Sequence, residues 1–498
     1  MSSAPEPPPR PDPAPAASSR DTAGSVWRLF SPGLLPATLM LGGGVTLFAV
    51  ETYVTATVAP SIVRDIGGLD LFAWLTTLYV AAAVLGAQFV ALRPRTLGLR
   101  GVYTVGALVF SAGSLVCAAA PAMPVVLLGR AVQGLGAGML SGLAYAFIRH
   151  VYPEPLWRKA STLYAAIWGV ATFLGPTAGG LFAGGANWRY AFSILVPPAL
   201  LMAASAGRLL PRVADERQDA RPPLAQISLL LAAVLLVSAA GTDGRADLKT
   251  GMLAGSLALF AAMLGLERRA ATRLLPHGAT RLGQPIARLY LVMFGLIITV
   301  SSDVYIPYFL QTLHGVAPLT SGYLVALVAL GWTLTAFFTG TLRGRGAVLA
   351  ISAGCTLEAG ATLALAPLLG DETAWGGWMA MAPAVLAILA MGGGVGLCWA
   401  HLVAGVLRWA GDAEQDKASA AIATVQSLGG ALGAALSGVI ANGAGLVDPG
   451  GLAGAQAAAH WLFLLMAAPG ATAFFVSLVP ERAVSPSTPR KAPTEREK

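Results

Sequence analysis

Apolar stretches of about 20 residues, the length of a membrane-spanning helix, recur along nearly the whole chain. Short charged or turn-rich segments separate them. We therefore predict a series of transmembrane helices. A first group of six is expected at 34–58, 71–92, 101–120, 124–148, 161–183 and 190–207. After a charged segment come two shorter runs and then a last group of six, at 224–241, 249–266, 286–311, 320–341, 347–369, 378–405, 418–441 and 459–479.

These runs predict an all-α membrane protein with fourteen transmembrane helices, arranged as two six-helix bundles with two inserted helices. The expected units are a disordered tail over 1–30, an N-terminal bundle over 31–210, a linker with two extra helices over 211–285, a C-terminal bundle over 286–480 and a disordered tail over 481–498. The tails contain no apolar run that would offset the entropy of ordering. Glycines indicate an internal repeat, because the spacing of Gly134 and Gly138 recurs at Gly392 and Gly396.

The formal net charge of +8 raises the question of a nucleic-acid partner, and the positions of the basic residues answer it. With the N-terminus in the cytoplasm, cytoplasmic segments hold 27 of the 32 Lys and Arg residues. The outside loops hold only Arg64, Arg189, Arg245 and Lys249. This asymmetry follows the positive-inside rule. We predict a multi-pass protein of the inner membrane with both termini cytoplasmic, and we expect no nucleic-acid partner.

Enzyme and metal signatures are missing from the sequence. The three cysteines, Cys117, Cys355 and Cys398, lie within apolar runs without CxxC spacing, so they indicate no metal site. No GxxxxGK[ST] phosphate loop and no HExxH motif occurs, and no loop is long enough for a catalytic domain. We therefore expect no catalytic residues, no cofactor and no bound metal, and we predict that the chain is not an enzyme.

Four charged residues lie in the interior of the expected helices, away from the helix ends: Glu51, Arg130, Asp303 and Glu358. A charge at the bilayer centre costs at least about 2.5 kcal/mol, so each needs a partner, a water-filled cavity or a function. Helix arithmetic puts three of them about 9–12 Å from the outer helix ends and Glu358 about 16 Å in. A carboxylate facing Arg130 at equal depth would form an ion pair, and protonation that competes with that pair is a coupling device. We predict that these four residues couple transport to protons.

Polar residues near these charges are expected to line a substrate cavity. They are Tyr53, Thr55, Gln133, Tyr305 and Tyr308. The alternative interpretation is that their side chains only bridge helices by hydrogen bonds. Pro307 removes the hydrogen bond to the Asp303 carbonyl and predicts a kink, and broken helices often line the sites of transporters.

Three motifs resemble those of a known family. In the first expected helix, ETYVTATVAP places an acid nine residues before a proline, at Glu51 and Pro60. The fourth contains LLGRAVQGLGAG around Arg130, and the fifth contains GPTAGG. The chain thus resembles the fourteen-helix drug:proton antiporter branch of the major facilitator superfamily. The motif positions besides Glu51 and Arg130 are Pro60, Gly134, Gly138, Gly175, Pro176, Gly179 and Gly180. The loop after the second helix keeps basic Arg93, Arg95 and Arg100 but lacks the usual Asp.

The resemblance implies proton-coupled export of a lipophilic or cationic small molecule by alternating access. Expected partners are that substrate, protons and the lipid bilayer, with a periplasmic adaptor left open. Two alternatives remain: a dedicated exporter of a native lipid or metabolite, and a non-transporting receptor or assembly partner on the same fold. Costly charges within the helices disfavour the last alternative, because a scaffold gains nothing from them.

Overall fold

The computed structural model describes residues 26–92, 97–183, 188–211, 223–242, 244–371, 378–411 and 414–478. Within these residues, fourteen helical segments are long and apolar enough to cross a membrane, which confirms the predicted number. Residues 1–25 of the predicted N-terminal tail and the whole predicted C-terminal tail, 481–498, lie outside the described residues, as do Arg93 and Arg95. The last five residues of the expected N-terminal tail, Val26–Phe30, form a 3-10 helix (η1) with Leu29 buried.

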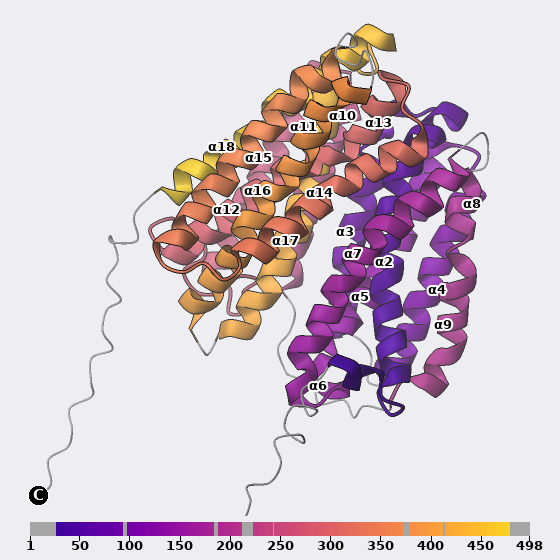
Figure 1. Cartoon of the computed structure of the whole chain (residues 1–498), viewed down its shortest axis with the longest axis vertical. Coiled ribbons are helices and arrows are strands. Elements are labelled where there is room, and N and C mark those ends of the chain that lie inside the picture. Colours follow the sequence, from indigo (N-terminus) through magenta and orange to yellow (C-terminus); the bar gives the residue numbers. More distant parts are fainter. Residues whose placement is uncertain are drawn as a thin grey trace, which may run out of the picture.

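The first part of the chain forms one bundle, which we call the N half. Its long helices are α2 (Leu35–Ile66), α3 (Trp74–Leu92), α4 (Gly98–Ala118), α5 (Met123–Ala146), α7 (Trp157–Phe182) and α9 (Val196–Leu209). Its short elements are η2 (Leu69–Leu71), α6 (Ile148–Val151), η3 (Glu154–Leu156) and α8 (Trp188–Ser193). Figure 1 shows this half in indigo to magenta.

The remainder forms a hairpin and a second bundle, which we call the C half. The hairpin consists of α10 (Leu224–Thr242) and α11 (Ala246–Arg269). The C half consists of α12 (Pro285–Val300), η5 (Ser301–Tyr305), α13 (Ile306–Thr312), α14 (Pro318–Thr339), α15 (Arg345–Gly370), α16 (Trp378–Ala410), α17 (Gln415–Gly443) and α18 (Gly451–Ser477). The hairpin is attached through α10, which packs along α17, while α11 packs along α10.

Two helices extend furthest beyond the hydropathy pattern at one end. α18 begins at Gly451 rather than at 459, and α2 continues past 58 to Ile66. The polar end of α2 is tolerated because Asp65 accepts hydrogen bonds from Trp188 at 2.9 Å and Arg189 at 2.6 Å. The expected depth of Glu51 is therefore wrong, since 15 residues of α2 put it about 22 Å from the helix end.

The two halves repeat the same glycine packing. A methyl group on Gly138 of α5 would collide with the Ala83 carbonyl oxygen of α3, and one on the matching Gly396 of α16 would collide with the Trp332 carbonyl oxygen of α14. Such close backbone approach is how helices associate in lipid, where burial of apolar surface gives little driving force. The α3–α5 and α14–α16 pairs are thus held by equivalent contacts, as the repeated glycine spacing predicts.

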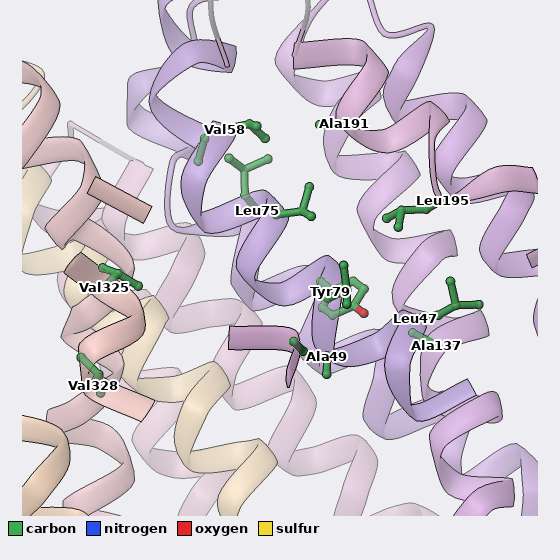
Figure 2. Packing of buried hydrophobic residues seen from close by; sticks show 14 of the residues in the cluster. Leu47, Ala49, Val58, Leu75, Tyr79, Ala137, Ala191, Leu195, Val325 and Val328 are labelled. Carbon is green, nitrogen blue, oxygen red and sulfur yellow. The ribbon is translucent and has the colours of Figure 1, made fainter. Parts of the chain in front are cut away.

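The halves meet at the end of the molecule where α2 finishes, which we call the Ile66 end; the opposite end is the Leu35 end. There Arg64 Nη2 donates to Gln311 Oε1 at 3.0 Å, and Asn442 Nδ2 donates to the Asp70 carbonyl at 2.9 Å. In Figure 1 the two halves come together toward the top of the view. Figure 2 shows side chains from both halves that belong to one continuous apolar cluster: Ala49, Leu75, Tyr79, Val325 and Val328.

Candidate functional site

Glu51 of α2 and Arg130 of α5 form an ion pair in the interior of the N half. Arg130 Nη1 donates to Glu51 Oε1, and the two side chains are 0% and 1% exposed for Glu51 and Arg130, respectively. Oε1 also accepts a hydrogen bond from Thr55 Oγ1 at 2.6 Å, whereas Oε2 has no hydrogen-bond partner among the described residues. The structure thus brings together two of the four charged residues expected within helices.

The Arg130 guanidinium is held from several sides. Its Nε donates to the Leu75 carbonyl of α3 at 3.0 Å, and Nη1 donates to Gln133 Oε1 at 2.6 Å. Gln133 Nε2 in turn donates to Ser114 Oγ of α4 at 2.8 Å. The Tyr79 ring lies under the guanidinium, with its centroid 4.0 Å from Cζ. A planar guanidinium can form an ion pair, donate to a carbonyl and stack on an aromatic ring at the same time, which a lysine ammonium cannot.

Three groups of this network were not predicted from the sequence. Tyr79 and Ser114 look like hydroxyl residues that bridge helices inside apolar runs, and Leu75 contributes only its backbone carbonyl. A backbone acceptor has no side-chain signature. The i, i+3 spacing of Arg130 and Gln133 was the one local signal that pointed to the network.

Asp303 lies where the helix expected at 286–311 breaks. α12 ends at Val300, and Asp303 belongs to the 3-10 helix η5 before α13 begins. Pro307 has no N–H for the Asp303 carbonyl, which instead accepts from the Ile306 N–H one residue earlier. The predicted interruption is confirmed. The Asp303 side chain is half-buried. Among the described residues, no hydrogen bond or ion pair joins it to Arg130.

Glu358 of α15 is enclosed in the C half, away from the ion pair. It is fully buried, and neither carboxyl oxygen has a partner among the described residues. Gly394 of α16 packs closely against the Glu358 backbone. Gly136 of α5 packs in the same way against the Phe110 backbone of α4. Glu358 therefore occupies the place in the C half that Phe110 occupies in the N half. One turn away, the buried Thr362 hydroxyl also lacks a hydrogen-bond partner within the described segments.

The residues expected to line a cavity separate into three environments. Thr55 and Gln133 belong to the ion-pair network. Tyr53 lies on the other side of α2, with its hydroxyl near Thr172 and within electrostatic range of Asp303.

Tyr305 and Tyr308 instead take part in the contact between the halves. Their rings pack on Phe72 of the N half, with centroids 4.9 Å and 5.4 Å away. Tyr305 is 0% exposed. In this conformation the two tyrosines close the Ile66 end.

The GPTAGG segment of α7 lies where α2, α7 and α14 meet. A methyl group on Gly175 would collide with the Tyr53 side chain of α2, and one on Gly179 would lie 2.8 Å from Thr57 Cβ. On the other side, Gly180 faces Leu319 of α14, and Pro176 faces Gly322 of the same helix. Pro60 is buried within α2. Gly175 and Gly179 thus set the spacing between α7 and α2, and Pro176 and Gly180 set the spacing between α7 and α14 of the C half.

Comparison with known proteins places this arrangement in a family. A family model described as the Major Facilitator Superfamily matches residues 39–402. The chain belongs to this superfamily. It is a multi-pass membrane protein of a transporter family.

Relatives within the Major Facilitator Superfamily cover most of the chain. A Mycobacterium tuberculosis protein named "Probable multidrug-efflux transporter" is 35% identical over 457 residues, which is 90% of this chain and 96% of that protein. A multidrug transporter protein of Bacillus subtilis is 26% identical over 79% of this chain and 73% of its own length.

Solved structures share the fold at low sequence identity. A peptide transporter of the POT type has a TM-score of 0.64 at 13% identity and covers 89% of this chain and 94% of that chain. A bacterial homolog of the human lysosomal transporter Spinster, in an inward-facing conformation, has a TM-score of 0.61 at 16% identity and covers 92% of this chain and 100% of that chain.

Proposed function

We propose that the chain is a proton-coupled antiporter that exports lipophilic or cationic small molecules by alternating access of its two halves. The observation that carries this proposal is the sealed Glu51–Arg130 pair, in which one carboxylate oxygen has no hydrogen-bond partner in the described part of the chain. A charge pair buried in a membrane bundle is costly and marks function by default. The names of the two bacterial relatives, one a probable multidrug-efflux transporter and the other a multidrug transporter protein, support the substrate class.

In the proposed coupling, Glu51 exchanges its pairing with Arg130 for a proton. The proton binds at Oε2, which has no hydrogen-bond partner among the described residues. Neutralising the carboxylate removes its attraction for the guanidinium, which the Leu75 carbonyl, Gln133 and the Tyr79 ring still hold in place. The packing between α2 and α5 would then change, and this local change would couple protonation to transport. Thr55 orients the carboxylate by its hydrogen bond to Oε1.

Substrate is proposed to bind on the Tyr53 side of α2, between the halves. Asp303 offers a carboxylate there, within electrostatic range of Tyr53, and no described ion pair neutralises it. Glu51 is paired with Arg130 and Glu358 is enclosed elsewhere in the C half, so Asp303 is the carboxylate that makes this side negative when it is unprotonated. Organic cations are therefore favoured over anions.

Orientation follows from the loop charges. We propose that the Leu35 end faces the cytoplasm of a bacterial inner membrane, with both termini on that side, because most Lys and Arg residues lie in segments at that end. The contacts of Arg64 with Gln311 and of Phe72 with Tyr305 then close the outer side.

Proton release from purified protein tests the proposal. Tetraphenylphosphonium, a lipophilic cation, is added to full-length protein in weakly buffered detergent containing a pH-sensitive dye. Antiport requires that cation binding release protons, and Glu51→Gln should reduce that release. Cation binding without proton release in the wild type would contradict proton coupling.

A further inference from the structure

A pocket of about 560 Å³ lies between the α10–α11 hairpin, α12 and α17, outside the site described above. Its walls are apolar over most of their length. Representative lining residues are Leu230 and Val234 of α10, Leu257 and Phe260 of α11, Phe294 of α12 and Leu428 of α17. The Phe260 and Phe294 rings face each other across α11 and α12, stacked with centroids 6.4 Å apart.

The pocket extends through about one leaflet of a bilayer. Its lining includes Leu253 and Arg268 at the two ends of a 15-residue stretch of α11, about 22 Å by helical rise. One leaflet contributes about 15 Å of hydrocarbon, plus its headgroup layer. Because α11 is attached to the protein through α10 and is largely exposed, the pocket is accessible from the lipid side.

One end of the pocket is cationic. Arg268, its one lining residue with a formal charge, sits at the Leu35 end and donates a single described hydrogen bond, to the Thr280 carbonyl at 2.9 Å. A guanidinium has five N–H donors, so donors remain for an anion. The adjacent Arg269 and the nearby Arg281 are exposed.

The acidic neighbour of Arg268 is already engaged. Glu267 is buried, and its two carboxylate oxygens accept backbone N–H groups of Leu274 at 3.1 Å and Leu275 at 2.7 Å. These bonds fold the 270–275 segment so that Leu274 and Leu275 close that end of the pocket. Glu267 thus shapes the pocket beside Arg268, and the exposed charges next to it are basic.

We propose that this pocket binds an anionic phospholipid from the leaflet at the Leu35 end. Its phosphate would pair with Arg268, and an acyl chain would extend between α11, α12 and α17 toward Leu253. Basic pockets between transmembrane helices are the recognised chemistry for anionic headgroups. The lipid fills the space that α11 leaves against α12 and α17. A cationic substrate would be repelled by Arg268, which separates this pocket from the proposed transport site.

Native mass spectrometry of the full-length protein tests the proposal. Phosphatidylglycerol and phosphatidylcholine with identical acyl chains are titrated separately onto detergent-purified protein. We expect phosphatidylglycerol to bind about tenfold more tightly, and Arg268→Gln to remove most of that preference. Leu257→Trp, which narrows the pocket from an exposed position of α11, should weaken binding of both lipids. Arg343→Gln is the matched control, since Arg343 is also exposed but does not line the pocket.

Three results would overturn the proposal. Equal binding of the two lipids to wild type would remove the headgroup interaction. If Arg268→Gln kept the preference for phosphatidylglycerol and Leu257→Trp bound both lipids as the wild type does, the lipid would bind elsewhere on the protein. Displacement of phosphatidylglycerol by tetraphenylphosphonium would assign the pocket to transported cations. The lipid readout does not depend on transport, so failure of the proposed antiport would leave it intact.

Discussion

Glu51 and Arg130 face each other between α2 and α5, and neither side chain is more than 1% exposed. A buried pair of this kind adds little net stability compared with apolar residues of similar volume. Removal of one partner, however, leaves the other charge unpaired in a protein interior of low dielectric constant. Stability and transport should therefore respond differently to single and double substitutions at these two positions.

Arg130→Met should lower stability, because it leaves the Glu51 carboxylate without its cation. Loss of one partner of a buried pair costs about 3–5 kcal/mol. The double variant Glu51→Gln with Arg130→Met should recover much of that loss, since no unpaired charge remains, yet it should not transport. Thermal unfolding of purified protein checks the stability, and efflux from proteoliposomes checks the activity. A double variant as unstable as Arg130→Met alone would argue that the pair is not the origin of the effect.

Glu51→Gln and Asp303→Asn should each abolish efflux driven by an imposed pH gradient while the protein stays folded, although Glu51→Gln should be the less stable variant because Arg130 loses its partner. Each substitution keeps the size of the side chain and removes the group that binds a proton. Asp303→Glu should retain part of the activity because it keeps a carboxyl group near Tyr53. Glu154→Gln, an exposed carboxylate in η3, serves as the control and should transport normally. Wild-type efflux in both amide variants would remove these carboxylates from the coupling mechanism.

Gly138→Ala should destabilise the N half. Its new methyl group would collide with the Ala83 carbonyl oxygen, so α3 and α5 would have to move apart. Overpacking of this kind costs about 1–3 kcal/mol. Gly169→Ala in α7 is the control, because no atom lies within 4 Å of its added methyl group. The melting temperatures of the two variants decide the question: equal values would mean that α3 and α5 have room to adjust.

Single cysteines at Arg245 and Asp371 should react with a membrane-impermeant maleimide from outside intact cells. A cysteine at Arg343 should react only after the membrane is opened, as should one at Arg217, which lies outside the described residues. The three native cysteines are buried and can be replaced to give a clean background. Protection of position 245 from outside reagent would mean that α10 and α11 do not span the membrane as proposed.

The sequence by itself determined the number of helices, because each apolar run must satisfy its own backbone hydrogen bonds in lipid. It also located the break at Pro307, which follows from a missing N–H within one turn. The glycine repeat was readable for the same reason: close helix approach requires small residues at fixed spacing. These are local properties of one segment.

Only the tertiary structure decided which helix stands beside which. It selected Glu51 as the partner of Arg130, gave the guanidinium the Leu75 carbonyl and the Tyr79 ring, and packed Tyr305 on Phe72. It also left the space between α11, α12 and α17. These relationships join positions tens to hundreds of residues apart, and hydrophobicity is similar on many faces of such helices. Neighbours are therefore set by the fit of side chains between helices, which hydropathy does not encode.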